Sequence, residues 1–91
     1  MSGKAEKLSP EIIEDEMAVS LARAVATANR AAKEAGISLE DSLRTITELS
    51  GNTTRWRINY GPKNYRNRRG GDFIVEVDAG DASIQKVLRG Q

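Results

Sequence analysis

Basic side chains with tyrosines between them dominate the middle of the chain. Residues 51–71, "GNTTRWRINYGPKNYRNRRGG", carry a net charge of +6 without a single acid. Guanidinium and ammonium groups bind phosphates or carboxylates, and tyrosine rings can stack on nucleic-acid bases. This segment is therefore the candidate partner-binding surface, and its members are Arg55, Arg57, Lys63, Tyr65, Arg66, Arg68 and Arg69.

Two kinds of partner fit this surface, and a third interpretation needs no partner. The isoelectric point near 8.1 is lower than that of a dedicated nucleic-acid-binding domain. Arg55 and Arg57 alternate along a predicted strand, so they would also keep its outer face hydrated. Of the two partners we favour an acidic protein surface, with nucleic-acid binding through residues 55–69 as the alternative function. A solvated loop without a partner explains the basic residues at least as well as either.

The residue types required for most catalytic and metal sites are missing. The chain has no His and no Cys, which removes the commonest general base, the commonest zinc ligand and any thiolate. Asp72, Asp78 and Asp81 lie near glycines, but their spacing is not that of a calcium loop, and aspartates are common in turns. Glu76 and Asp78 would share a strand face that nothing marks as a cleft. We expect no enzyme, no metal site and no cofactor.

One apolar stripe with spacings of three and four predicts a helix from residue 10 to residue 35. Ser9-Pro10 suits the start of a helix and Gly36 suits its end. The stripe consists of Ile13, Met17, Leu21, Ala24, Ala28, Ala32 and Ala35. Its second half is all alanine, so we expect that half to lie close against a sheet.

Strands are predicted after the helix. Residues 54–60, 72–78 and 82–90 alternate between apolar and polar side chains, and 42–49 fit either a strand, which we favour, or a short helix. One apolar sheet face would contain Trp56, Ile58, Tyr60, Phe73, Val75, Val77 and Ile84. The predicted fold is α+β, with one long N-terminal helix packed on a three- or four-stranded antiparallel sheet that ends in a β-hairpin. Residues 1–8 would be a flexible leader and 9–91 a single domain.

The predicted helix is longer than the predicted sheet. A helix over 10–35 would measure ~39 Å, whereas strands of six or seven residues run ~20–23 Å. The overhanging end would expose Ile12, Ile13, Met17 and Leu21, and such apolar patches usually mark an interface. We therefore expect a homodimer through these residues; a helix that begins nearer Ala18 would instead leave a monomer.

No stretch approaches the ~20 apolar residues that a membrane-spanning helix needs, and the N-terminus lacks the apolar core of a signal peptide. We expect a cytoplasmic protein without a membrane partner. Removal of a signal peptide from a secreted protein would leave the same sequence.

The C-terminal segment "GGDFIVEVDAGDASIQKVLRGQ" resembles PepSY-type small bacterial domains. The matching residues are Val75, Val77, Asp78, Gly80, Ile84 and Val87. The threonine of the Val-Asp-x-x-Thr-Gly turn is absent here. Gly70, Gly71, Asp78, Gly90 and Gln91 also resemble the end of small immunity proteins with a nuclear-transport-factor-like fold. Both resemblances imply a non-catalytic binding or inhibitory module, and PepSY domains are associated with inhibition of secreted peptidases.

Overall fold

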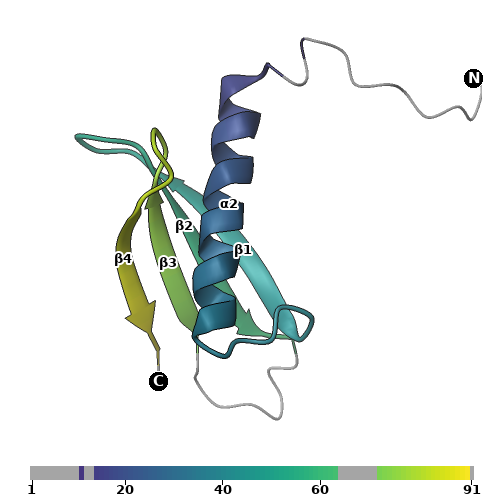
Figure 1. Cartoon of the computed structure of the whole chain (residues 1–91). Coiled ribbons are helices and arrows are strands. Elements are labelled where there is room, and N and C mark those ends of the chain that lie inside the picture. Colours follow the sequence, from purple (N-terminus) through teal and green to yellow (C-terminus); the bar gives the residue numbers. More distant parts are fainter. Residues whose placement is uncertain (1–10, 12–13, 64–71, 91) are drawn as a thin grey trace, which may run out of the picture.

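The fold is one helix lying on a four-stranded antiparallel sheet (Figure 1). The structure is a computed structural model that describes residues 11, 14–63 and 72–90. Its elements are helix α2 (Glu16–Glu34) and strands β1 (Ser42–Leu49), β2 (Arg55–Pro62), β3 (Phe73–Asp78) and β4 (Ile84–Arg89). The strands lie in the order β1-β2-β3-β4, each antiparallel to its neighbour. This architecture confirms the predicted α+β class, and residues 42–49 form the strand that we favoured.

Helix α2 begins later than predicted. Asp15 is extended, with φ −65° and ψ 115°, and its side chain accepts a hydrogen bond from the Ala18 amide at 2.8 Å. Asp15 is therefore the N-cap, because its carboxylate binds one of the amides that the first turn leaves unpaired. The prediction of one continuous helix from residue 10 is wrong, since Glu14 and Asp15 are not helical.

The helix ends where the sequence predicts. Gly36 has a left-handed φ of 85°, its amide donates to the Lys33 carbonyl, and the Ile37 amide donates to the Ala32 carbonyl at 2.9 Å. These two bonds make a Schellman motif, which satisfies carbonyls that the last turn would leave unpaired. Ile37 then packs beside the core and turns the chain toward β1.

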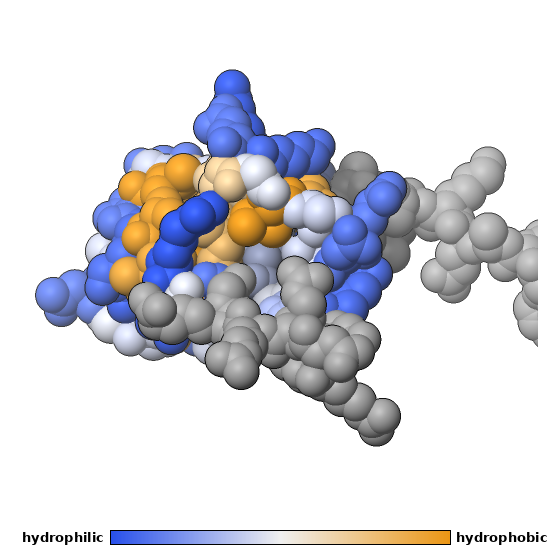
Figure 2. All heavy atoms as spheres, turned by 90° about the horizontal axis from the view of Figure 1, so that it is seen from below, coloured by the Kyte–Doolittle hydropathy of each residue, from blue (hydrophilic) through white to orange (hydrophobic). Residues whose placement is uncertain are grey.

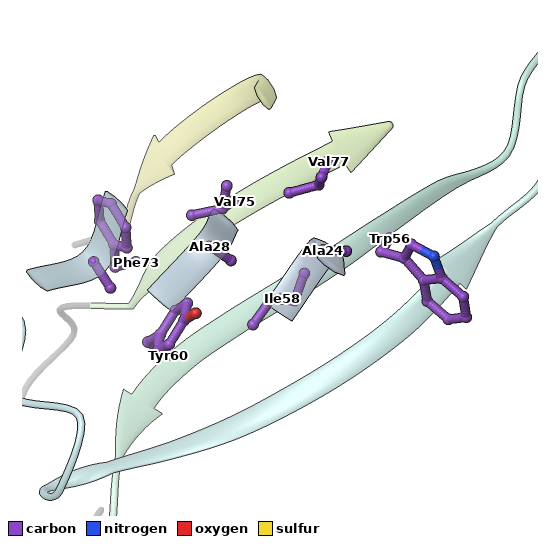
Figure 3. Packing of buried hydrophobic residues seen from close by; sticks show 9 residues of the cluster. Ala24, Ala28, Trp56, Ile58, Tyr60, Phe73, Val75 and Val77 are labelled. Carbon is purple, nitrogen blue, oxygen red and sulfur yellow. The ribbon is translucent and has the colours of Figure 1, made fainter. Parts of the chain in front are cut away.

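The core lies between α2 and the two central strands. Ala24, Ala28 and Ala32 are fully buried. Below them, side chains of β2 and β3 point toward the helix (Figure 3). These sheet residues are Trp56, Ile58, Tyr60, Phe73, Val75 and Val77. Because alanine is small, the helix can lie close to the sheet, so the predicted role of the stripe is confirmed.

Ile84 is the exception among the predicted core residues. It lies opposite Val77 in the β3–β4 register, on the helix side of the sheet, but 45% of it is exposed. The helix packs mainly on β2 and β3 and does not reach across β4. Ile84 therefore shares the predicted face without being part of the core. Figure 2, which views the molecule from below, shows apolar side chains that reach the surface.

The turn between β3 and β4 is fastened to the helix. Ser20 donates to the Ala79 carbonyl at 2.7 Å and accepts a hydrogen bond from the Trp56 indole at 2.8 Å, and Thr27 donates to the Ala82 carbonyl at 3.1 Å. Ala82 has a φ of 60°, in the left-handed region that side chains with a Cβ rarely adopt. The contacts to the helix hold this turn in place despite that cost.

We expect Ala28→Leu to lower the free energy of unfolding by about 1–3 kcal/mol, because extra methyl groups would push the helix away from the sheet. Ala26→Leu is the matched control, since Ala26 is exposed on the same helix and should change stability by less than about 0.5 kcal/mol. Urea unfolding measures both. Equal effects of the two substitutions would contradict close packing at Ala28.

Glycine at position 82 should relieve the left-handed conformation. We expect Ala82→Gly to raise the free energy of unfolding by about 0.5–1 kcal/mol, because the relief of about 1–2 kcal/mol exceeds the added freedom of the unfolded chain. Thermal unfolding would show a higher Tm. A lower Tm would mean that the strain at Ala82 is smaller than its backbone angle indicates.

Candidate binding surface

The sheet face opposite the helix is the candidate binding surface. Residues that lie directly opposite each other in an antiparallel pair share a face, so the strand registers assign this face. We call it the outer face, and it consists of Leu43, Thr45, Thr47, Leu49, Arg55, Arg57, Asn59, Ile74, Glu76, Lys86 and Leu88. Within the described part of the chain, no helix or strand covers it (Figure 1).

At the centre of the outer face, two arginines hold one carboxylate. Arg57 donates to Glu76 Oε2 through Nε at 3.1 Å and through Nη2 at 2.7 Å, and Arg55 donates to Oε1 at 3.2 Å. We call these three residues the Arg–Glu cluster. Glu76 is only 2% exposed although it lies on the uncovered face, because the arginine side chains lie over it. Both guanidinium groups remain partly open to solvent.

The cluster fixes the charge of Glu76. The hydrogen bonds from Arg57 lower the pKa of this carboxyl, burial acts in the opposite direction, and the nearby charges of Arg57, Arg55 and Lys86 lower the pKa further. Glu76 is therefore ionised at neutral pH. One carboxylate and two guanidinium groups leave the cluster with a net positive charge, and each guanidinium has more N–H donors than Glu76 can accept.

The structure separates the predicted basic residues into groups. Arg55 and Arg57 lie at the start of β2, and Lys63 follows its other end, ~20 Å from Arg57 at the usual rise per residue. Tyr65, Arg66, Arg68 and Arg69 lie outside the described residues. Three carboxylates also share the outer-face side of β3, at Asp72, Glu76 and Asp78. The described part of the surface is therefore of mixed charge.

The residues predicted for self-association are separated too. Met17 is 59% exposed, whereas Leu21 packs against the core. Ile12 and Ile13 lie outside the residues whose side chains are described. Helix α2 has 19 residues, or ~28 Å, and β1 and β2 have eight residues each, or ~26 Å, so the described helix does not overhang its sheet by two turns.

Glu76 is the site residue that the sequence did not reveal. Its alternation within 72–78 placed it on a polar face, but nothing local showed that two arginines would cover it. The signal lay in pairing: Arg57 is directly opposite Glu76 in the β2–β3 register. A register is needed before such a pair can be recognised, because a shift of one residue would move Glu76 to the other face.

In the described part of the chain, acids do not gather into a group that could hold a metal ion. The single helix described there is too polar to span a membrane. Tyr60 is neutral as well as buried: desolvation raises its pKa to about 12, against a smaller opposing effect of Arg44, and its hydroxyl donates to Asn29 at 2.7 Å. Tyr60 is therefore a structural residue.

We expect Glu76→Gln to lower the free energy of unfolding by about 1.5–3 kcal/mol, the range for hydrogen bonds to charged groups. The pKa of Glu76 is lowered in the folded protein, so its stabilisation is fully present above the ordinary value of 4.5 and is lost as the pH falls through the lowered pKa. The free energy of unfolding, measured by denaturation at several pH values, should therefore fall less steeply toward acidic pH in the variant than in wild type.

The control for this series is Glu40→Gln, a change at an exposed residue that should change the free energy of unfolding at neutral pH by less than about 0.5 kcal/mol. An equal loss of stability on acidification in wild type and Glu76→Gln would mean that the Arg–Glu cluster does not stabilise the fold.

A search of protein-family models, of curated proteins and of solved structures found no match to this chain.

Proposed function

We propose that this protein is a non-catalytic binding module whose outer face engages an acidic surface of a protein partner. The observation that carries this proposal is the Arg–Glu cluster at the centre of an uncovered sheet face. Arg55 and Arg57 are partly exposed there, and their shared carboxylate satisfies only part of their hydrogen-bonding capacity.

Guanidinium groups whose orientation is already restrained bind a partner effectively. Glu76 restrains both side chains before a partner arrives, so binding would cost less side-chain entropy than it would with free arginines. Arginine is also enriched among the residues that dominate the energy of protein interfaces. The cluster therefore provides two oriented donors for carboxylates of the partner.

Exposed apolar side chains lie elsewhere on the outer face. Leu43 on β1 and Leu88 on β4 are 47% and 41% exposed, on either side of the central strands. A face that combines charged and exposed apolar side chains fits a protein surface better than a nucleic-acid backbone.

The resemblance of residues 72–91 to PepSY-type domains supports an inhibitory role as one form of this binding. No His or Cys is present to serve as a general base or nucleophile, and the proposal assigns no catalytic residue and no cofactor. The localisation that accompanies the proposal is cytoplasmic, or extracellular where a signal peptide has been removed.

The test is affinity capture of partners with wild type and with Thr47→Glu as baits. Thr47 lies directly opposite Arg57 and is exposed, so a carboxylate there would occupy Arg57 and repel an acidic partner. We expect a partner that wild type retains and Thr47→Glu loses, with affinity for the purified partner lowered at least about tenfold.

Ala26→Glu is the control, because it adds the same charge on the helix side and should retain the partner. Mixed-sequence RNA and DNA are tested in parallel. Binding of nucleic acid with a log–log salt slope of several units, abolished by Thr47→Glu, would replace the proposal with a nucleic-acid-binding function. Partners retained equally by all three baits would contradict a role of the outer face.

A further inference from the structure

Strand β1 is a regular edge strand. It pairs with β2 through all eight residues without a shift in register, and its other edge has no partner among the described residues. Leu43 and Ile46 are 47% and 42% exposed, one on each face. Edge strands are often blocked by lysine, proline, a bulge or inward-pointing charges. β1 has no lysine, proline or bulge, and its two charges on the helix side, Arg44 and Glu48, are opposite in sign.

The sequence of β1 is symmetric about Ile46. Residues 43–49 read "LRTITEL", so that leucine mirrors leucine and threonine mirrors threonine on either side of the central residue. The remaining mirror pair, Arg44 and Glu48, has opposite charges. When two copies of a strand pair antiparallel about a two-fold axis, each residue lies opposite its mirror residue in the other copy. This symmetry therefore makes β1 complementary to itself.

The backbone of β1 is oriented for such pairing. The Lys63 amide donates to the Asp41 carbonyl at 3.4 Å, in continuation of the β1–β2 ladder. Main-chain groups alternate in direction along an antiparallel strand, so odd-numbered residues of β1 bond to β2. Arg44, Ile46 and Glu48 then direct their amides and carbonyls to the free edge. These are the residues whose mirror pairs would exchange N–H···O bonds.

We propose that two copies of this protein pair antiparallel through β1, with the two-fold axis at Ile46. On the helix side of the sheet, Arg44 of each copy lies opposite Glu48 of the other, and the two Ile46 side chains meet. On the outer face, Leu43 lies opposite Leu49 of the second copy. The two four-stranded sheets become one continuous sheet.

The neighbourhood of β1 leaves room for a second copy. Helix α2 lies over β2 and β3 rather than over β1 (Figure 1). Arg44 is exposed, and its contact with Asn29 is long, at 3.5 Å. Its guanidinium can therefore turn to a carboxylate of the second copy without breaking a short hydrogen bond.

The opposite edge of the sheet does not have this complementarity. Strand β4 carries Lys86 and Arg89 and no acid, and its register with β3 shifts between Glu76 and Val77. Self-pairing there would offer no unlike charges to pair across the axis. Its exposed apolar residues are thus no evidence for the same kind of contact, and the proposal is restricted to β1.

The dimer is expected to depend on concentration. One strand pair is small beside the roughly 1,200–2,000 Å² that stable interfaces bury. Sedimentation from about 1 µM to about 500 µM should show a shift from monomer to dimer, corresponding to a micromolar Kd. A monomer throughout this range would overturn the proposal.

Charge reversal tests the register. Arg44→Glu and Glu48→Arg each oppose like charges twice across the axis, so each variant alone should dimerise at least about tenfold more weakly. Mixed together, the two variants oppose only unlike charges and should form a heterodimer about as strong as the wild-type dimer. The mixing result separates loss of pairing from loss of folding. Gln85→Glu, on the β4 edge, should dimerise like wild type.

A cross-link tests the axis directly. Opposed residues in a hydrogen-bonded antiparallel pair have Cα atoms about 5.5 Å apart, which suits a disulfide. Because the chain has no cysteine, Ile46→Cys should give a covalent dimer under mild oxidation, and Val87→Cys on β4 should stay largely monomeric. Cross-linking of Val87→Cys alone, or a wild-type dimer insensitive to both charge reversals, would place the interface elsewhere.

Discussion

The close contact between one alanine-faced helix and two strands determines which surfaces of this protein are covered. An α-helix is about 10 Å wide and strands lie about 4.8 Å apart, so one helix covers about two strands. Ala24, Ala28 and Ala32 bring the helix down onto β2 and β3, where the apolar side chains are buried. Strands β1 and β4 lie at the margins of this contact, where Arg44 approaches Asn29 and Arg89 donates a hydrogen bond to the Ala35 carbonyl at 3.0 Å. Their apolar residues stay exposed because one helix covers only about two of the four strands, and the sequence pattern alone does not show this.

The outer face is not covered by any helix or strand of the described residues, so polar and charged side chains must keep it stable there. The Arg–Glu cluster contributes to this stability, because the guanidinium groups of Arg55 and Arg57 bind Glu76. A buried carboxylate is costly when it is unpaired, but here it accepts two hydrogen bonds from Arg57 and one from Arg55. The same arrangement that stabilises the face also orients the groups proposed to meet a partner.

The sequence predicted where the helix and strands lie better than it predicted which of their side chains are buried. Alternation located the strands, and Gly36 marked the end of the helix, because these signals are local. The start of the helix was missed because Asp15 competes with Ser9 as a cap, and the choice depends on where the helix meets the sheet. The exposure of Ile84 and the burial of Glu76 depend on strand register and on the reach of the helix. Neither can be obtained from periodicity.

The symmetry of "LRTITEL" is another sequence pattern that can be interpreted only once the arrangement of the strands is known. The symmetry is visible in the sequence. It becomes informative only once the structure shows that β1 is an edge strand and that its even-numbered residues direct their main-chain amides and carbonyls to the free edge. If β1 pairs as proposed, the two-fold axis stands perpendicular to the sheet, so both helices lie on one side and both outer faces on the other. Two Arg–Glu clusters would then face the same direction on one rigid surface. A partner with two acidic sites would bind such a dimer more tightly than a monomer, because its second contact would form within the complex.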